Sequence, residues 1–200
     1  YAGKMERKPF LKISRNGGKD WGNDMQVINN SIEGKIVPAV SGKNVYLAWI
    51  DKNEKELCFK LSKDNGDNWE PDKRLAKSKY NLTFPNIAAS DNFIHIIYNE
   101  IKDYKSQTKY LRSDDYGIQW NDSISIITKN GFFPSISSSG KNVNVIWQDD
   151  RTEQSDISMI YTKRSTDGGL VLGNEIALTE DVGFSSNPSI TTSGNEIHTI

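Results

Sequence analysis

The chain lacks several features that mark other classes of protein. Its 200 residues include a single cysteine, Cys58, so an internal disulfide framework is excluded. The strand-like neighbours of Cys58 favour a packed thiol over a reactive one. Apolar runs extend for only a few residues, far short of the roughly 20 that a membrane-spanning helix needs. We therefore expect no membrane span in this chain.

Charge of one sign and cofactor motifs are also missing. The sequence has 25 basic and 26 acidic residues and no basic run or stripe that would follow a phosphate backbone, which excludes nucleic acid as an expected partner. No glycine-rich loop leads into a helix, so no nucleotide cofactor is expected. His95 and His198 occupy equivalent places in two repeats, and we expect them to pack in the fold and not to bind a metal.

One short pattern occurs four times and can be written S-x-[DN]-x-G-x-x-[WL]. The clearest copy is SKDNGDNW, from Ser62 to Trp69. Successive copies begin 48, 51 and 52 residues apart, about one sheet of four short strands per repeat. The motif residues are Ser14, Asn16, Gly18 and Trp21; Ser62, Asp64, Gly66 and Trp69; Ser113, Asp115, Gly117 and Trp120; and Ser165, Asp167 and Gly169.

A second element recurs in phase with the first. It begins at a proline and places a turn signal between two alternating apolar runs, which is typical of a hairpin. Each period therefore predicts strand A just after the proline, strand B ending at an aromatic residue, strand C running into the S-x-D-x-G turn, and strand D after it. The prolines are Pro38, Pro85, Pro134 and Pro188, and the first three hairpins end at Trp49, Tyr98 and Trp147.

The repeats and the absence of a 3.6-residue period predict an all-β fold, a β-propeller of four-stranded antiparallel blades. Apolar residues on both faces of strand B, such as Ile94, Ile96 and Ile97, fit a sheet that is buried between neighbouring blades. We expect about four blades' worth of strands, as a fragment of a propeller with six or more blades. The alternative is that the terminal half-blades pair and close a four-bladed ring. The expected divisions are strands C and D in 1–30, blades in 31–80, 81–130 and 131–182, and strands A and B in 183–200.

The repeated motif resembles the Asp-box, or BNR repeat, of sialidases and sialidase-like β-propellers. That resemblance implies a structural turn between strands C and D, and the residue types agree. Asp64 can accept hydrogen bonds from turn amides, Gly66 permits positive φ, and Trp69 can fill space beside the next strand. The resemblance also implies an exported or cell-surface protein, in a family that includes sialidases, other glycosidases and non-catalytic receptors.

A ligand site is expected on the rim opposite these turns, where the loops between strands B and C and between blades lie. Carboxylates follow strand B in three blades, and an arginine beside two of them suits a sugar carboxylate or hydroxyls, because arginine binds carboxylates bidentately. The alternative is a solvated or mutually paired loop. The candidate ligand residues on this rim are Asp51, Glu100, Asp149, Asp150 and Arg151.

The resemblance to sialidases implies three arginines that clamp the substrate, an aspartate acid/base, and a tyrosine nucleophile activated by a glutamate. Of the arginines in the sequence, only Arg151 is clearly predicted to lie on the ligand rim. No hairpin proline is the last residue of an Arg-Ile-Pro triplet. Three functions stay open: sialidase-like glycoside hydrolysis, glycan or protein binding without catalysis, and a structural module at the cell surface. The sequence predicts no oligomeric state.

Overall fold

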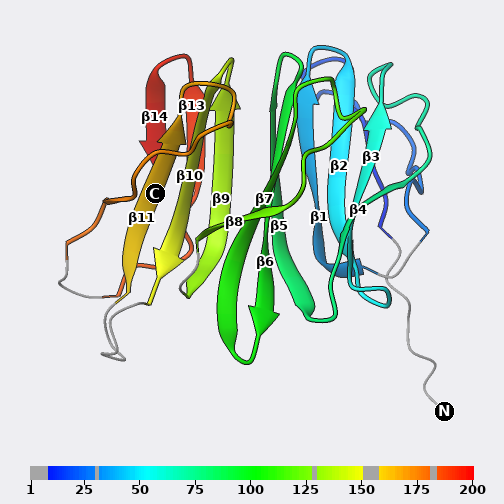
Figure 1. Ribbon diagram of the computed structural model, residues 1–200. Coiled ribbons are helices and arrows are strands. Elements are labelled where there is room, and N and C mark those ends of the chain that lie inside the picture. The colour runs from blue at the N-terminus through cyan, green and yellow to red at the C-terminus, as the bar shows by residue number, and fades with distance from the viewer. Residues whose placement is uncertain (1–8, 30–31, 128–129, 151–157, 181–183) are drawn as a thin grey trace.

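The computed structural model describes residues 9–29, 32–127, 130–150, 158–180 and 184–200 (Figure 1). Within these ranges the regular structure consists of strands, so no helix there has the length and apolar character needed to cross a membrane. Three four-stranded antiparallel sheets and one hairpin stand beside one another (Figure 1). This arrangement confirms the predicted all-β fold built from propeller blades.

Consecutive strands are hydrogen-bonded neighbours in every sheet, as short antiparallel connections allow. The first sheet contains β1 (Ile32–Ser41), β2 (Asn44–Asp51), β3 (Glu56–Ser62) and β4 (Lys73–Lys77). The second contains β5 (Asn81–Ser90), β6 (Phe93–Lys102), β7 (Lys105–Ser113) and β8 (Ile124–Ile127). The third contains β9 (Gly131–Ser139), β10 (Asn142–Asp149), β11 (Met159–Ser165) and β12 (Ile176–Ala177), and the hairpin contains β13 (Ile190–Ser193) and β14 (Glu196–Thr199).

The prediction that strand A begins just after the proline is wrong for all three four-stranded sheets. β1, β5 and β9 begin several residues earlier and contain the proline. Proline has no N–H for a ladder, and the register of β5 shifts around Pro85, between Thr83 and Asn86. Pairing resumes beyond this bulge, so the strand continues through a residue that normally ends one.

Hydrophobic cores lie between neighbouring sheets. Ile94 and Ile96 pack in a cluster shared by the first and second sheets, whereas Ile97 packs in a cluster shared by the second and third. Successive side chains of a strand point to opposite faces, so β6 contributes to both cores. Both faces of the second sheet are therefore buried, as the apolar residues on both faces of strand B predict.

The segment 9–29, part of the region predicted as strands C and D of a first blade, contains one antiparallel bridge between Leu11 and Met25. The two residues exchange N–H···O bonds of 2.9 and 3.0 Å. Val27 and Ile28 then pack beside Trp49 of the first sheet. The segment thus covers the face of the first sheet that is turned away from the second.

Each repeated motif forms the same hydrogen-bonded turn, which we call a box turn. The Ser62 hydroxyl donates to Asp64 Oδ1 and accepts from the Gly66 N–H, both at 2.8 Å. Asp64 Oδ1 also accepts from the Asn68 N–H at 2.9 Å. The other three copies repeat these bonds, with an amide oxygen of Asn16 in place of the carboxylate. Hydrogen bonds from Asn68 and Ser62 lower the pKa of Asp64 to about 2.

Hydrogen bonds between turns define two rims of the molecule. The Asn65 N–H of a box turn donates to the carbonyl of Lys43, in the turn between β1 and β2, at 2.8 Å, and the second and third sheets repeat this contact. We call this end the box rim. At the opposite end, the Ser78 N–H of a sheet-to-sheet connection donates to the carbonyl of Lys55, in the turn between β2 and β3, at 3.1 Å. We call that end the loop rim.

The last motif glycine of a box turn lies against the preceding sheet. A Cβ atom on Gly117 would lie 2.8 Å from the Phe59 ring, and a Cβ atom on Gly169 would lie 1.8 Å from the Tyr110 hydroxyl. Both glycines have positive φ, a conformation that side chains disfavour. Gly18 has the same motif position and a φ of +85°, but no atom lies within 4 Å of its Cβ direction.

This contrast separates backbone strain from inter-sheet packing. Gly18→Ala should lower the free energy of unfolding by about 1 kcal/mol, the cost of positive φ alone. Gly169→Ala should lower it by about 3 kcal/mol, because overpacking against Tyr110 adds to that strain. Urea unfolding of the two variants measures both values. Equal losses would contradict a packing role for the box glycine.

His95 is buried between the second and third sheets. Its Nδ1 lies 2.8 Å from the Tyr110 hydroxyl, and the two rings stack with centroids 6.0 Å apart. Burial, with a smaller effect of the Arg112 charge, lowers the pKa of His95 to about 3. His95 therefore packs as a neutral imidazole, as expected. The same expectation is wrong for His198, which is exposed in β14. In the part of the chain that the structure describes, no group of three or more His, Cys, Asp or Glu residues is arranged to hold a metal ion.

The buried imidazole predicts a loss of stability in mild acid. Below its ordinary pKa of about 6.5, His95 takes up a proton in the unfolded chain, whereas the folded chain resists protonation down to pH 3. The free energy of unfolding should therefore fall by about 2 kcal/mol between pH 6.5 and pH 5, a range above most carboxylate titration. His95→Asn, which introduces the residue found at the equivalent Asn144, should remove this slope in urea unfolding at each pH. If the pH dependence of the free energy of unfolding were unchanged in His95→Asn, other titratable groups would be responsible for it.

Candidate functional site

The predicted rim carboxylates of the first two sheets are engaged with neighbouring protein groups. Asp51, at the end of β2, is 3% exposed. Its Oδ1 accepts from the N–H groups of Asn53 and Glu54 at 3.0 and 3.2 Å. Its Oδ2 lies 3.4 Å from Arg74 Nη1. These contacts hold the β2–β3 turn closed, and they show that Arg74 reaches the loop rim, a placement that sequence reasoning did not make.

Glu100 and Asp149 have comparable local partners. Glu100 Oε1 accepts from the Ser78 hydroxyl at 2.5 Å, and its Oε2 lies 3.6 Å from Lys109 Nζ. Asp149 is 2% exposed and accepts from the indole N–H of Trp147 at 3.1 Å. These bonds tie each carboxylate to its own blade or to the connection before it.

The remaining two candidates follow β10. Asp150 Oδ1 accepts from the Gln148 side-chain amide at 3.2 Å. Arg151 lies outside the described residues. The candidate rim residues therefore come from three different sheets, and among them Asp51 lines the larger of the two cavities described next.

A cavity of about 240 Å³ lies where the first strands of successive sheets meet, and we call it the inner cavity. β1 packs against β5, β5 against β9, and β9 against β13, so these strands form the inner edges of the blades. Two phenylalanines give the cavity an apolar surface, and their rings meet edge to face with centroids 4.7 Å apart. The lining residues are Lys35, Phe84, Pro85, Asn86, Phe133, Pro134, Ser135, Asn187, Pro188 and Ser189.

Three residues of the inner cavity share an unusual backbone conformation. Phe84, Phe133 and Asn187 each precede the hairpin proline of their blade and have φ values of 51°, 48° and 54°. Positive φ is a genuine outlier for a bulky side chain and costs of order 1 kcal/mol or more. Because the positive φ recurs at the same position in three blades, one side chain from each of these blades lines the same cavity. Such strain is often found at ligand sites.

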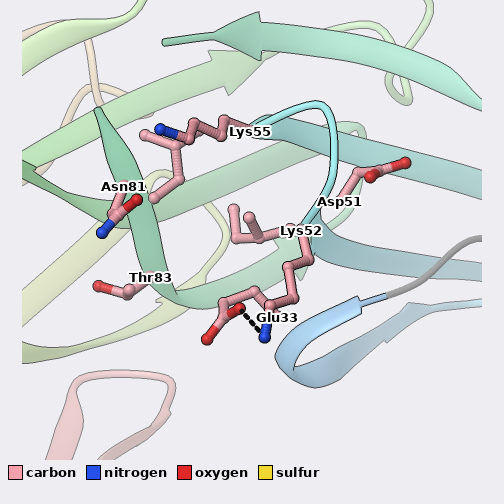
Figure 2. Close-up of a pocket in the computed structure, with 8 residues that line it drawn as sticks. Glu33, Asp51, Lys52, Lys55, Asn81 and Thr83 are labelled. Atoms are coloured by element: carbon pink, nitrogen blue, oxygen red, sulfur yellow. Dashed lines mark ion pairs between the residues drawn. The ribbon is translucent and has the colours of Figure 1, made fainter. Parts of the chain in front are cut away.

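A second cavity, of about 330 Å³, lies between the first and second sheets, and we call it the interblade cavity (Figure 2). Asn81 and Thr83 of β5 form one wall, and Lys52 and Lys55 of the β2–β3 turn face it (Figure 2). Lys52 Nζ forms an ion pair with Glu33 Oε2 at 3.4 Å (Figure 2). The remaining lining residues are Ile50, Asp51 and Leu82.

The sequence predicted a ligand site on the loop rim and did not indicate the residues of the inner cavity. The two phenylalanines occur in the segments Thr83-Phe84-Pro85 and Phe132-Phe133-Pro134. Their signal was an aromatic residue before the hairpin proline in two consecutive repeats. These aromatic residues stand where the resemblance to sialidases predicts an Arg-Ile-Pro triplet.

No family model matches the chain, and no curated protein matches it. Solved structures do. An α-L-arabinanase of Penicillium chrysogenum, complexed with arabinobiose, matches with a TM-score of 0.69 and 12% identity over 96% of this chain and 66% of that chain. A Trypanosoma rangeli sialidase matches with a TM-score of 0.61 and 12% identity over 88% of this chain and 35% of that chain. A mutant α-L-arabinofuranosidase of Fusarium graminearum matches with a TM-score of 0.58 and 12% identity, over 96% of this chain and 66% of that chain.

The chain thus spans 66% of the length of the arabinanase and about a third of the sialidase, 35%. At 12% identity these matches establish the fold that the chain shares with propeller glycosidases.

Because the backbone at Phe84 and Phe133 is strained, we expect glycine to be more stabilising than alanine at these two positions, the reverse of the usual order in a strand. Glycine adopts positive φ without steric cost, whereas alanine does not. Phe84→Gly should therefore unfold with a free energy about 1 kcal/mol higher than Phe84→Ala, and Phe133 should behave alike. At Phe93, which begins β6 with ordinary φ, the alanine variant should be the more stable. Urea unfolding of the three pairs tests this order, and the same ranking at Phe84 and Phe93 would contradict strain at Phe84.

Proposed function

We propose that the chain is part of a carbohydrate-directed propeller in which a sugar ring stacks on Phe84 and Phe133 in the inner cavity. The observation that carries this proposal is the pair of phenylalanines at one strained position of two neighbouring blades, surrounded by polar groups. Binding sites combine an apolar surface with a few placed polar groups. Asn86 and Asn187 supply amide donors and acceptors to the sugar hydroxyls.

The structural neighbours support the same ligand class. The arabinanase is complexed with arabinobiose, and other matching sialidase structures hold sialic acid. We infer that the repeated motifs are Asp-boxes of a sialidase-like propeller and that they act as scaffold. We also infer an exported or cell-surface protein, whose glycan ligand is outside the cell.

Glycoside hydrolysis is the finer form of this proposal. It requires two carboxylic residues around the scissile bond, or a nucleophile that replaces one of them. Asp149, Asp150 and Arg151 are the proposed contributors from the loop rim. Hydrolysis is tested by assaying the protein with fluorogenic sialosides and arabinofuranosides. Turnover by the unchanged protein that is lost in Asp149→Asn or Arg151→Ala would support this form of the proposal. Binding without turnover would favour a glycan-binding propeller.

Binding is tested by calorimetric titration of the chain with arabinobiose and with 3′-sialyllactose. Phe84→Gly and Phe133→Gly should each weaken binding at least tenfold, about 1.4 kcal/mol, because each removes one of the two aromatic rings of the cavity while relieving backbone strain. Phe184→Gly is the matched control, since Phe184 is 66% exposed and lies outside both cavities. Affinity unchanged in both cavity variants, or failure of both sugars to bind, would contradict the proposal.

A further inference from the structure

We infer that the site takes a neutral oligosaccharide, with one sugar in the inner cavity and the next in the interblade cavity, and not a single terminal acidic sugar. This inference rests on the proposed function, because the first sugar occupies the inner cavity. It adds a second binding position whose residues lie outside that cavity.

The two cavities are neighbours along one strand. In β5, Asn81 to Thr83 line the interblade cavity, and Phe84 to Asn86 line the inner cavity. β1 repeats this order, with Glu33 at the interblade cavity and Lys35 at the inner one. A ligand stacked on Phe84 therefore lies beside the entrance to the space between the first two sheets. The inner cavity, at about 240 Å³, is smaller than typical ligand pockets of about 300–1,000 Å³, so a ligand of two or more sugars needs both cavities.

The charges of the interblade cavity are balanced and engaged with protein atoms. Lys52 pairs with Glu33 at 3.4 Å, and Lys55 Nζ donates to the Lys79 carbonyl at 3.1 Å. The Asp51 carboxylate is bonded to its own turn and points away from the β5 wall in Figure 2. In the interblade cavity an anionic sugar would have to compete with these partners for a cation, although the Lys52–Glu33 pair is exposed and therefore weak. The inner cavity adds one cation, Lys35.

Two groups of the wall suit sugar hydroxyls. The hydroxyl of Thr83 is buried, and among the described residues it has no hydrogen-bond partner. The Thr83 hydroxyl oxygen has less than 1 Å² of accessible surface, so it can bond a ligand hydroxyl only after its side chain rotates to another rotamer. That rotation would relieve the cost of a buried hydroxyl without a partner. Asn81 is exposed beside it, and its amide can both donate and accept. The Asn81 amide thus offers both a donor and an acceptor to the hydroxyls of a neutral sugar.

Calorimetric titration with L-arabinose, arabinobiose, arabinotriose and 3′-sialyllactose tests this inference. Affinity should rise at least tenfold from arabinose to arabinotriose. Asn81→Ala and Thr83→Val should remove most of this gain and leave the affinity for arabinose unchanged. Lys105→Ala, a change at an exposed lysine on the same rim of the same sheet but outside both cavities, is the matched control and should alter neither affinity. Raising NaCl from 50 to 500 mM should change arabinotriose binding less than twofold, because no ion pair is formed.

The outcomes separate the two proposals. The second binding position is overturned if arabinotriose binds no more tightly than arabinose, or if neither Asn81→Ala nor Thr83→Val changes its affinity. In that case, arabinose binding that depends on Phe84 would still support the first position in the inner cavity. Tighter, salt-sensitive binding of 3′-sialyllactose overturns the neutral ligand. Absence of any binding that depends on Phe84 overturns the proposed function together with this inference.

Discussion

The fold depends on the hydrogen-bonded serine of each box turn. Ser62 Oγ joins the carboxylate of Asp64 to the N–H of Gly66 within one tight turn, and the other copies repeat the arrangement. Because the turn is closed in this way, its glycine is held at positive φ against the preceding sheet, where a Cβ atom would collide with Phe59 or Tyr110 in the later copies. One local motif therefore sets both the end of the third strand and the distance between neighbouring blades.

The same constraint determines how the box rim is occupied. Box turns hydrogen-bond to the turns between first and second strands, and cations of the preceding blade bind their carbonyls, as Lys73 Nζ does at Gly117 (2.6 Å) and Arg112 Nε does at Gly168 (3.0 Å). The box rim is thus occupied by contacts that hold blades together. Within the inner strands the register of β5 shifts around Pro85, and the residues before Pro85 and Pro134 are phenylalanines that line the inner cavity.

The sequence was sufficient for the fold and insufficient for the site, for a physical reason. A motif such as SKDNGDNW encodes its structure locally, since its three main hydrogen bonds join residues within seven positions, and the repeat spacing then predicts the blades. The inner cavity depends instead on a bulge and a positive φ, which neither alternation nor propensity indicates. Asp51 looked like a ligand residue because it follows a strand, but whether its oxygens face a ligand or the amides of Asn53 and Glu54 is decided by the loop conformation.

The inner cavity differs from a carboxylate clamp because one of the described residues that line it, Lys35, is charged and the others are apolar or neutral. An arginine triad needs long cationic side chains that converge on one anion. The position before the hairpin proline holds Phe84, Phe133 and Asn187 in three blades, whose side chains offer stacking and hydrogen bonds without charge. In the adjoining interblade cavity, Lys52 is paired with Glu33. A sugar held by such groups is selected by its shape and hydroxyl pattern, so discrimination should come from the number of sugars that the two cavities accommodate.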